Sequence, residues 1–186
     1  RGGKGARQRL EESTEEGAVP EEAPLWSALR HQSGVNGVYL MAGQQSGTSA
    51  TATLLTAGDD QDLRTMQLSF TLQGPANSQE LVMSGQTEGA CVVGAHASTI
   101  RGVCGTEWAA CTRPLPPATA KGHKGVVVSV GADQRVNVWG LPGLELLAAA
   151  VSEVCDASCV DARQVSGGML QVAVGGMGVQ TFYLPP

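Results

Sequence analysis

Aromatic residues and long apolar runs are scarce in this chain. Phe, Trp and Tyr make up 4% of its 186 residues, and no apolar stretch approaches the roughly 18 residues that a membrane-spanning helix needs. No signal-peptide pattern opens the sequence. We therefore expect an intracellular, cytoplasmic protein. Apolar residues still amount to 42% of the chain and glycine is frequent, with 25 residues, which favours an all-β protein with a packed core.

The cysteines lack the pattern of a disulfide framework or a zinc ribbon. Their number is odd and none form a C-x-x-C pair; they are Cys91, Cys104, Cys111, Cys155 and Cys159. Cys155 and Cys159 are separated by three residues, and His123 is the other soft ligand that could join them. Because free cysteine is more often a small buried hydrophobe, we expect neither a metal site nor a bound cofactor.

The chain also lacks a basic surplus, since its formal net charge is −5. Basic side chains cluster before Leu10, and six glutamates follow between Glu11 and Glu22. Residues 1–24 are therefore predicted to form a disordered charged arm or linker, with a transient helix at residues 8–16 as the alternative. Residues 31–186 hold 7 Lys and Arg against 11 Asp and Glu. Domains that bind nucleic acid alone are normally basic on one face, so we expect no independent RNA or DNA binding.

One hairpin sequence occurs three times. The clearest copy is VVVSVGADQRVNVW at residues 126–139, an apolar run, a polar turn and an alternating run. The stretch LLTAGDDQDLRTM matches it without gaps when Gly58 stands opposite Gly131. In a third copy, VAVGGMGVQTFYL, Gly175 stands opposite Gly131 and one residue is deleted. The sequence therefore predicts hairpins at residues 51–70, 126–139 and 169–184.

The spacing of the copies indicates a repeat protein with insertions. Gly131 and Gly175 are 44 residues apart, which suits a four-stranded propeller blade of about 40–45 residues. Gly58 and Gly131 are 73 residues apart, so the first repeat should carry roughly thirty extra residues. We expect the insertions at residues 73–89, rich in Gly, Ser and Gln, and at 107–122, whose prolines exclude a central strand.

Strands are expected throughout residues 25–186. They are predicted at residues 35–41, 51–57, 63–70, 80–84, 99–104, 126–130, 135–139, 144–151, 157–163, 169–174 and 178–183. The composition of residues 144–154 favours a helix, and the strand there follows from its place in the repeat. GGMG at 175–178 is assigned to a tight turn and not to a phosphate-binding loop, because no Lys-Ser/Thr pair or helix follows.

A set of polar residues accompanies the second hairpin: His96, Ser129, Asp133 and Trp139. Asp133 can accept a hydrogen bond from the histidine, the histidine can meet the serine hydroxyl, and the hydroxyl can accept from the indole N–H. Such a chain of bonds would satisfy every polar group inside a sheet. We therefore predict a buried structural network.

The other two copies keep this set only in part. The first offers His31, Thr56 and Asp60, with Met66 where tryptophan would stand. The third has Ala173 and Phe182 and no matching histidine or aspartate. We expect hydrophobic packing to replace the network in the third copy.

A Ser–His–Asp set also suggests a hydrolase, which would need its serine on a strained turn such as G-x-S-x-G beside an oxyanion hole. Ser129 instead lies within VVVSV, where a nucleophile would be inaccessible. We therefore interpret the set as structural and expect no catalytic residue. His123, in KGHKG, is expected in a solvated loop.

These features together resemble the WD-repeat β-propellers, with Val136–Trp139 as a variant of their closing dipeptide. HQSGVN, SVGADQRVNVW and AVGGMGVQTFY are similar, in the same order, to the C-terminal blades of a family of tRNA-methyltransferase partner subunits. The resemblance covers about residues 25–186, and the Pro-rich 107–122 and the Pro185-Pro186 ending depart from it. It implies about two and a third WD-repeat blades of an incomplete ring, because closure needs at least four.

The resemblance implies a non-catalytic scaffold. Members of that family partner an FtsJ-type RNA 2′-O-methyltransferase, which holds S-adenosylmethionine and methylates the wobble nucleotide of tRNA. The implied partners are that protein and, through the complex, tRNA, without a small-molecule substrate or a membrane span. A general protein-interaction adaptor in signalling or endosomal traffic, with no RNA role, fits the sequence equally well. An enzyme built on a propeller would need polar groups that converge on the central channel, and the sequence indicates no such groups.

Overall fold

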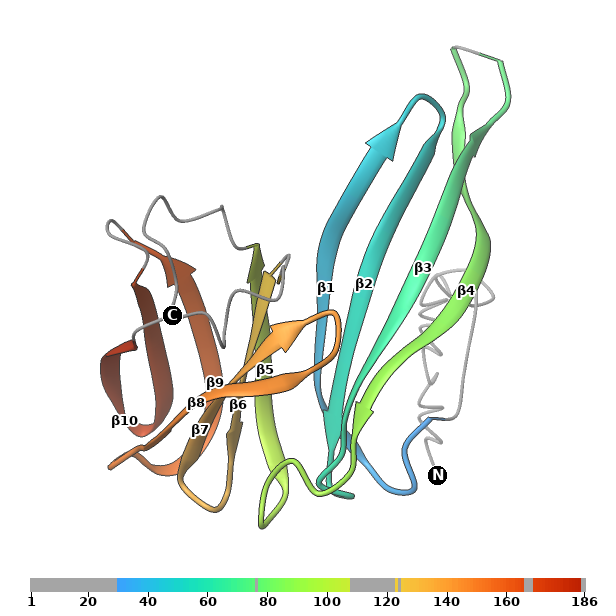
Figure 1. Ribbon diagram of the computed structural model, residues 1–186. Helices are drawn as coiled ribbons and strands as arrows, with labels where there is room; N and C mark the ends of the chain where they lie inside the picture. The colour runs from blue at the N-terminus through green and yellow to red at the C-terminus, as the bar shows by residue number, and fades with distance from the viewer. Residues whose placement is uncertain (1–29, 76, 108–122, 124, 166–168, 185–186) are drawn as a thin grey trace, which may run out of the picture.

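The computed structural model describes residues 30–184, apart from residues 76, 108–122, 124 and 166–168 (Figure 1). The predicted arm at 1–24 and most of the predicted insertion at 107–122 lie outside the described residues. In the described ranges all regular structure is β-strand, which confirms the all-β prediction. No helix in this part of the chain is long and apolar enough to cross a membrane.

Within the described residues ten strands form three antiparallel sheets, which we name A, B and C. Sheet A contains β1 (Val35–Ser46), β2 (Ser49–Gly58), β3 (Leu63–Gln73) and β4 (Glu80–Val92). Sheet B contains β5 (Ile100–Glu107), β6 (Gly125–Gly131), β7 (Arg135–Leu141) and β8 (Glu145–Val151). In both sheets the strands pair in sequence order. Sheet C pairs β9 (Cys155–Gln164) with β10 (Leu170–Leu184).

The long strand β10 bends back on itself. The Gln171 side chain donates a hydrogen bond to the Tyr183 hydroxyl, at 2.9 Å. In a straight strand these residues would lie roughly 40 Å apart. Figure 1 shows the bend, and Gly178 lies beside its midpoint with a φ of +131°. The chain therefore reverses its direction at GGMG, inside β10, while Gly175 and Met177 still pair with β9.

The first two hairpins close with the same turn. The Gln61 N–H donates to the Gly58 carbonyl at 3.2 Å, and the Gln134 N–H donates to the Gly131 carbonyl at 3.1 Å. Both glutamines have positive φ, 67° and 62°. This i to i+3 bond followed by a left-handed residue is a common hairpin geometry. The matching sequences GDDQ and GADQ therefore have matching backbones.

The extra residues of the first repeat lengthen its strands. The strands of sheet A have 10 to 13 residues, whereas those of sheet B have 7 or 8. The region predicted as an insertion at 73–89 contains only a short connection, and from Glu80 onward it belongs to β4. Figure 1 shows the long β1–β2 and β3–β4 hairpins extending beyond the strands of sheet B.

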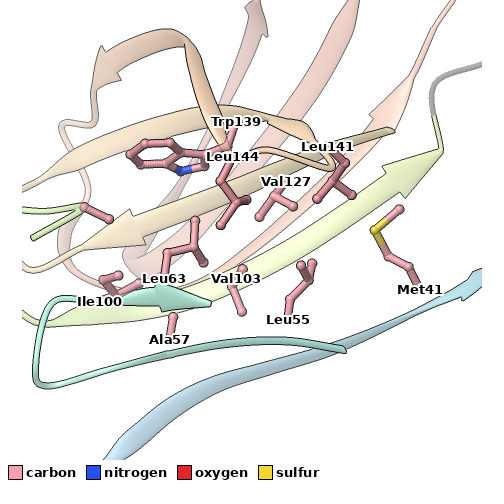
Figure 2. Packing of buried hydrophobic residues seen from close by; sticks show 11 residues of the cluster. Met41, Leu55, Ala57, Leu63, Ile100, Val103, Val127, Trp139, Leu141 and Leu144 are labelled. Atoms are coloured by element: carbon pink, nitrogen blue, oxygen red, sulfur yellow. The ribbon is translucent and has the colours of Figure 1, made fainter. Parts of the chain in front are cut away.

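Sheet B lies between sheets A and C and is buried on both faces (Figure 1). One face packs Val103, Val127 and Trp139 against Leu55 and Ala57 of sheet A (Figure 2). The other face packs its valines against sheet C. The buried residues of that core are Cys104, Val126, Val128, Val130, Val136, Val138, Val154, Ala157, Leu170, Val172 and Val174. This double burial explains why β6 is a continuous apolar run and not an alternating one.

The first strands of successive sheets approach closely at glycine. A Cβ atom on Gly37 of β1 would lie 2.9 Å from Val103 Cγ1 of β5. A Cβ atom on Gly102 of β5 would lie 3.2 Å from Cys159 Cα of β9. The two glycines occupy matching positions, because Gly37 pairs with Ala57 as Gly102 pairs with Val130. The stacking of A on B is therefore repeated in the stacking of B on C.

Candidate functional site

The second polar network is assembled in the space between sheets A and B. Asp133 Oδ1 lies 2.9 Å from His96 Nδ1, and His96 Nε2 lies 2.8 Å from Ser129 Oγ. Trp139 Nε1 donates to the same hydroxyl oxygen at 2.9 Å. With the His96 proton on Nδ1, the indole donates to the serine, the serine to His96 and His96 to Asp133. The structure thus brings together all four residues that the sequence singled out.

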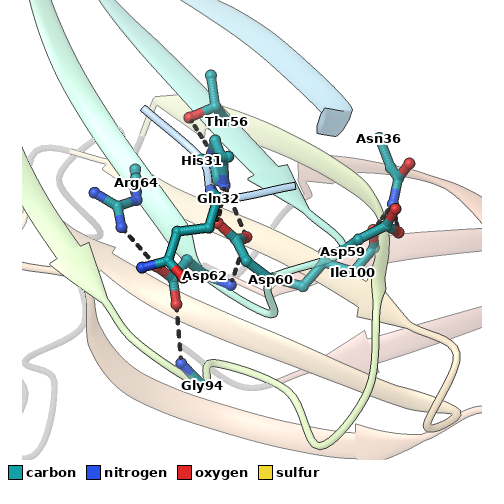
Figure 3. Close-up of polar contacts among 10 residues, drawn as sticks. All are labelled: His31, Gln32, Asn36, Thr56, Asp59, Asp60, Asp62, Arg64, Gly94 and Ile100. Carbon is teal, nitrogen blue, oxygen red and sulfur yellow. Dashed lines mark hydrogen bonds and ion pairs between the residues drawn. The ribbon is translucent and has the colours of Figure 1, made fainter. Parts of the chain in front are cut away.

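The first network has the same geometry without the indole (Figure 3). His31 Nδ1 lies 2.8 Å from Asp60 Oδ1, and His31 Nε2 lies 2.9 Å from Thr56 Oγ1. Met66 occupies the position of Trp139, so the hydroxyl receives no indole bond. Both histidines are buried in the structure. The two sheets therefore carry equivalent networks that differ in their last member.

Main-chain donors complete the bonding of both aspartates. Ala97 N–H and Arg135 N–H donate to Asp133 at 2.8 and 3.1 Å. Burial by itself raises the pKa of Asp133, but the bonds from His96 and the two N–H groups outweigh it and hold that pKa below 3.8. The pKa of Asp60 is lowered for the same reasons. Each aspartate thus links a hairpin turn to the segment that precedes its sheet.

Sheet C lacks the network but has a polar contact at the position of Asn137. Gln180 stands where Asn137 stands in sheet B, two residues before the terminal aromatic side chain. Its Oε1 accepts from Ser152 Oγ at 3.1 Å and from Glu153 N–H at 2.8 Å. The expected hydrophobic packing is present as well, because Phe182 packs against the core between sheets B and C. The Gln180 contact joins the segment after β8 to sheet C.

Sequence reasoning missed Asn137, which lies on the same face as Ser129. Its Nδ2 donates to the Ala95 carbonyl at 3.0 Å, next to His96. Reasoning also missed Asn36, whose Nδ2 donates to Asp59 at 2.7 Å and to the Ile100 carbonyl at 3.1 Å (Figure 3). Asn137 could have been found from the sequence, because it is a polar residue at an inward-facing position of an otherwise apolar strand.

The location of Ser129 decides what its network can do chemically. Its exposed fraction is 0%, and valines precede and follow it in β6. Its hydroxyl is already bonded to His96 and Trp139. A substrate cannot reach the oxygen without separation of sheets A and B. The network gives each buried polar group a hydrogen-bond partner and joins the segment before β5 to β6 and to the turn after it. This is a structural role.

His123 lies against sheet B and is not solvated, contrary to expectation. Its side chain is 10% exposed, and its Nδ1 lies 3.4 Å from the Leu141 carbonyl and 3.9 Å from Glu145. Gly140 makes room for it, since a Cβ there would lie 2.5 Å from the imidazole ring. Cys155 and Cys159 belong to sheet C and are exposed. Among the described residues no group of three or more His, Cys, Asp or Glu side chains could hold a metal ion.

A cavity of about 310 Å³ lies on the face of sheet A that points away from sheet B. Val35, Val38, Leu54 and Met66 form apolar walls, and Arg64 lies at one side. Arg64 Nη2 donates to Asp62 at 2.6 Å, while its buried Nε has no hydrogen-bond partner within the described part of the chain. Arg30, also at the cavity, pairs with Glu88.

No family model matches the chain, and no curated protein is similar to it. Among solved structures, the chain is similar to the crystal structure of the computationally designed Ika4 protein, at 12% sequence identity and a TM-score of 0.33. That match covers 88% of this chain and 99% of the designed chain.

Proposed function

We propose that this chain is a non-catalytic WD-repeat scaffold and the partner subunit of an FtsJ-type RNA 2′-O-methyltransferase that modifies the tRNA wobble nucleotide in the cytoplasm. The observation that carries the scaffold role is the repeated network. A histidine before the first strand, a hydroxyl on the second and an aspartate in the following turn recur in sheets A and B. Two four-stranded sheets and a bent third sheet support assignment to about two and a third blades.

The methyltransferase partnership rests on sequence resemblance. HQSGVN at residues 31–36, SVGADQRVNVW at 129–139 and AVGGMGVQTFY at 173–183 are similar, in order, to the C-terminal blades of the WD repeat-containing protein 6 family. The acidic balance of residues 31–186 supports contact with a protein more than with phosphate. In this proposal tRNA is reached through the complex.

A reconstitution experiment tests this proposal. The purified chain and an FtsJ-type methyltransferase should co-elute in gel filtration, and the chain should raise methyl transfer from S-adenosylmethionine to the tRNA wobble nucleotide. The chain alone should transfer no methyl group. An unrelated WD-repeat protein is the control and should do neither.

Two outcomes would contradict the proposal in different ways. Failure to bind the methyltransferase, with a chain shown to be folded by circular dichroism, would favour a general adaptor without an RNA role. Ester or nucleotide hydrolysis by the chain, lost specifically on Ser129→Ala in a folded variant, would overturn the non-catalytic role itself.

A further inference from the structure

A polar contact joins the β2–β3 turn of sheet A to the first strand of sheet B. Asn36 Nδ2 donates to Asp59 Oδ1 at 2.7 Å and to the Ile100 carbonyl at 3.1 Å (Figure 3). Asp59 lies in the turn, and Ile100 begins β5. We call Asn36, Asp59 and Ile100 the turn clasp. It connects a turn carboxylate of one sheet to the main chain of the next sheet.

Two positions of the turn clasp carry different residues between sheets B and C. Arg101 stands where Asn36 stands, since each directly precedes the glycine at which the first strands approach closely. Ala132 stands where Asp59 stands, since each follows the first glycine of its turn. Both of these N–H groups also donate, at 2.9 Å, to the carbonyl three residues after the network histidine. The exchange adds a positive charge and removes the carboxylate.

A cavity of about 510 Å³ lies at the corresponding place between sheets B and C. Ala157 is the counterpart of Ile100, since each lies three residues before the valine that meets the close-approach glycine. Arg101, Ala132 and Ala157 all line the cavity. The place that the turn clasp fills between sheets A and B is therefore open between sheets B and C.

The guanidinium of Arg101 lacks a partner in the cavity. It makes no hydrogen bond or ion pair within the described part of the chain, and its side chain is exposed. Arg64 and Arg163, by contrast, donate to Asp62 and Gln171. Because Ala132 replaces the turn carboxylate, the acceptor that sheet A would supply is missing in sheet B.

We propose that this cavity binds one acidic side chain, aspartate or glutamate, of a partner protein. Its carboxylate takes the place beside Arg101 that Asp59 takes beside Asn36. A guanidinium presents paired N–H donors that match the two oxygens of a carboxylate. The inference rests on the scaffold role of the proposed function and is independent of the methyltransferase partnership.

Asp156 restricts the kind of anion that fits. It lines the same cavity and is exposed, and its carboxylate has no hydrogen-bond or ion-pair partner among the residues that the structure describes. Phosphate or a run of acidic residues would bring further negative charge close to Asp156, and like charges repel. A peptide segment with one acidic side chain suits both groups, because its main chain also supplies N–H donors.

Cys155 allows a probe to be held in the cavity for a test. It lines the cavity and is exposed. The purified chain is equilibrated with equal amounts of two acetylated and amidated tripeptides, Cys-Gly-Asp and Cys-Gly-Asn, as a mixture of thiols and disulfides. The Cys155 thiolate attacks a peptide disulfide, forms a mixed disulfide and releases one peptide thiol. Mass spectrometry after acid quenching gives the ratio of the two peptides at each cysteine.

Cys155 should hold the aspartate peptide in preference to the asparagine peptide by about five-fold, the upper range for a partly exposed ion pair. Arg101→Gln should bring this ratio close to one without changing the urea midpoint, since Arg101 has no partner to lose among the described residues. Ala132→Asp should also lower the ratio, because it supplies the carboxylate as Asp59 does. Cys159, exposed on the same strand and outside the cavity lining, is the internal control and should show no preference.

Three results would overturn the proposal. The first is equal capture of the two peptides at Cys155, and the second is a preference that survives Arg101→Gln or is as strong at Cys159. The third is a preference that inorganic phosphate abolishes at constant ionic strength, because the cavity would then bind oxyanions in general. None of these results bears on whether the chain binds the methyltransferase, which the reconstitution tests separately.

Discussion

Asp133 joins three parts of the second repeat through its two carboxylate oxygens. It accepts from the His96 ring, from Ala97 N–H and from Arg135 N–H. Asp133→Ala should therefore lower the free energy of unfolding by about 1–3 kcal/mol, because the buried His96 ring loses its acceptor. Urea unfolding followed by circular dichroism measures it.

Asp161→Ala is the matched control for that variant. Asp161 is exposed, and its carboxylate accepts a bond from the neighbouring Ala162 N–H. Its replacement should change the free energy of unfolding by less than about 0.5 kcal/mol. Equal urea midpoints for Asp133→Ala and the parent would show that the network does not stabilise the fold.

The lowered pKa of both aspartates makes stability depend on pH. A carboxylate whose pKa falls on folding contributes stability that is fully present above its unfolded value, here 3.8, and is lost as the pH falls through the folded value. The midpoint should therefore drop below about pH 4, and the drop should be smaller in the double variant Asp60→Asn, Asp133→Asn. An identical pH profile for parent and variant would contradict this mechanism.

Residue types and spacing were enough to predict both networks, because a histidine, a hydroxyl and a turn aspartate each have one plausible bonding role within a hairpin repeat. Gln180 and His123 were not predictable in this way. Gln180 bonds to Ser152 and Glu153, which precede sheet C. The His123 side chain is 10% exposed, because Gly140 leaves space for its ring. Both depend on neighbours that are distant in sequence.

At the scale of single elements, the first strands decide how closely the sheets stack. Gly102→Ala would place a methyl group 3.2 Å from Cys159 Cα and 3.3 Å from Val160 N. Main-chain atoms cannot move aside as a flexible side chain can, so sheets B and C must separate. We expect a loss of about 1–3 kcal/mol of unfolding free energy, measured by thermal or urea unfolding.

Gly85→Ala is the control within a strand of the same fold. A Cβ on Gly85 would approach Ser69 Cβ at 4.0 Å, an ordinary contact. This variant should unfold at the parent midpoint or slightly above it, since alanine restricts the unfolded chain. If Gly102→Ala and Gly85→Ala lost equal unfolding free energy, the loss would come from replacing glycine in a strand and not from the close approach of sheets B and C.

The repeat predicted the strand positions correctly even where the local helix propensity favoured another structure. LELLAAAV favours a helix, yet residues 145–151 form β8 beside β7. Pairing with an existing strand and burial against sheet C outweigh local preference there. The added length of β3 and β4 was not predictable, because a Gly- and Ser-rich sequence is compatible with both a loop and an extended hairpin.

At the scale of the whole molecule, sheet B is enclosed while sheets A and C each have an open side. The continuous valine run of β6 was a sequence signal of this enclosure, since a strand buried on both faces needs no alternation. Nothing in the sequence identified Val35 and Val38 as uncovered.

The central claim is that the three sheets stack on one another and leave apolar side chains of sheet A, such as Val35 and Val38, exposed. Sedimentation velocity of residues 1–186 over a range of concentrations tests it most directly. Exposed apolar sheet faces promote association, so the sedimentation coefficient should rise continuously with concentration, and the rise should be weaker for Val38→Asp. A single monomeric species at every concentration, with the same behaviour in Val38→Asp, would contradict the account.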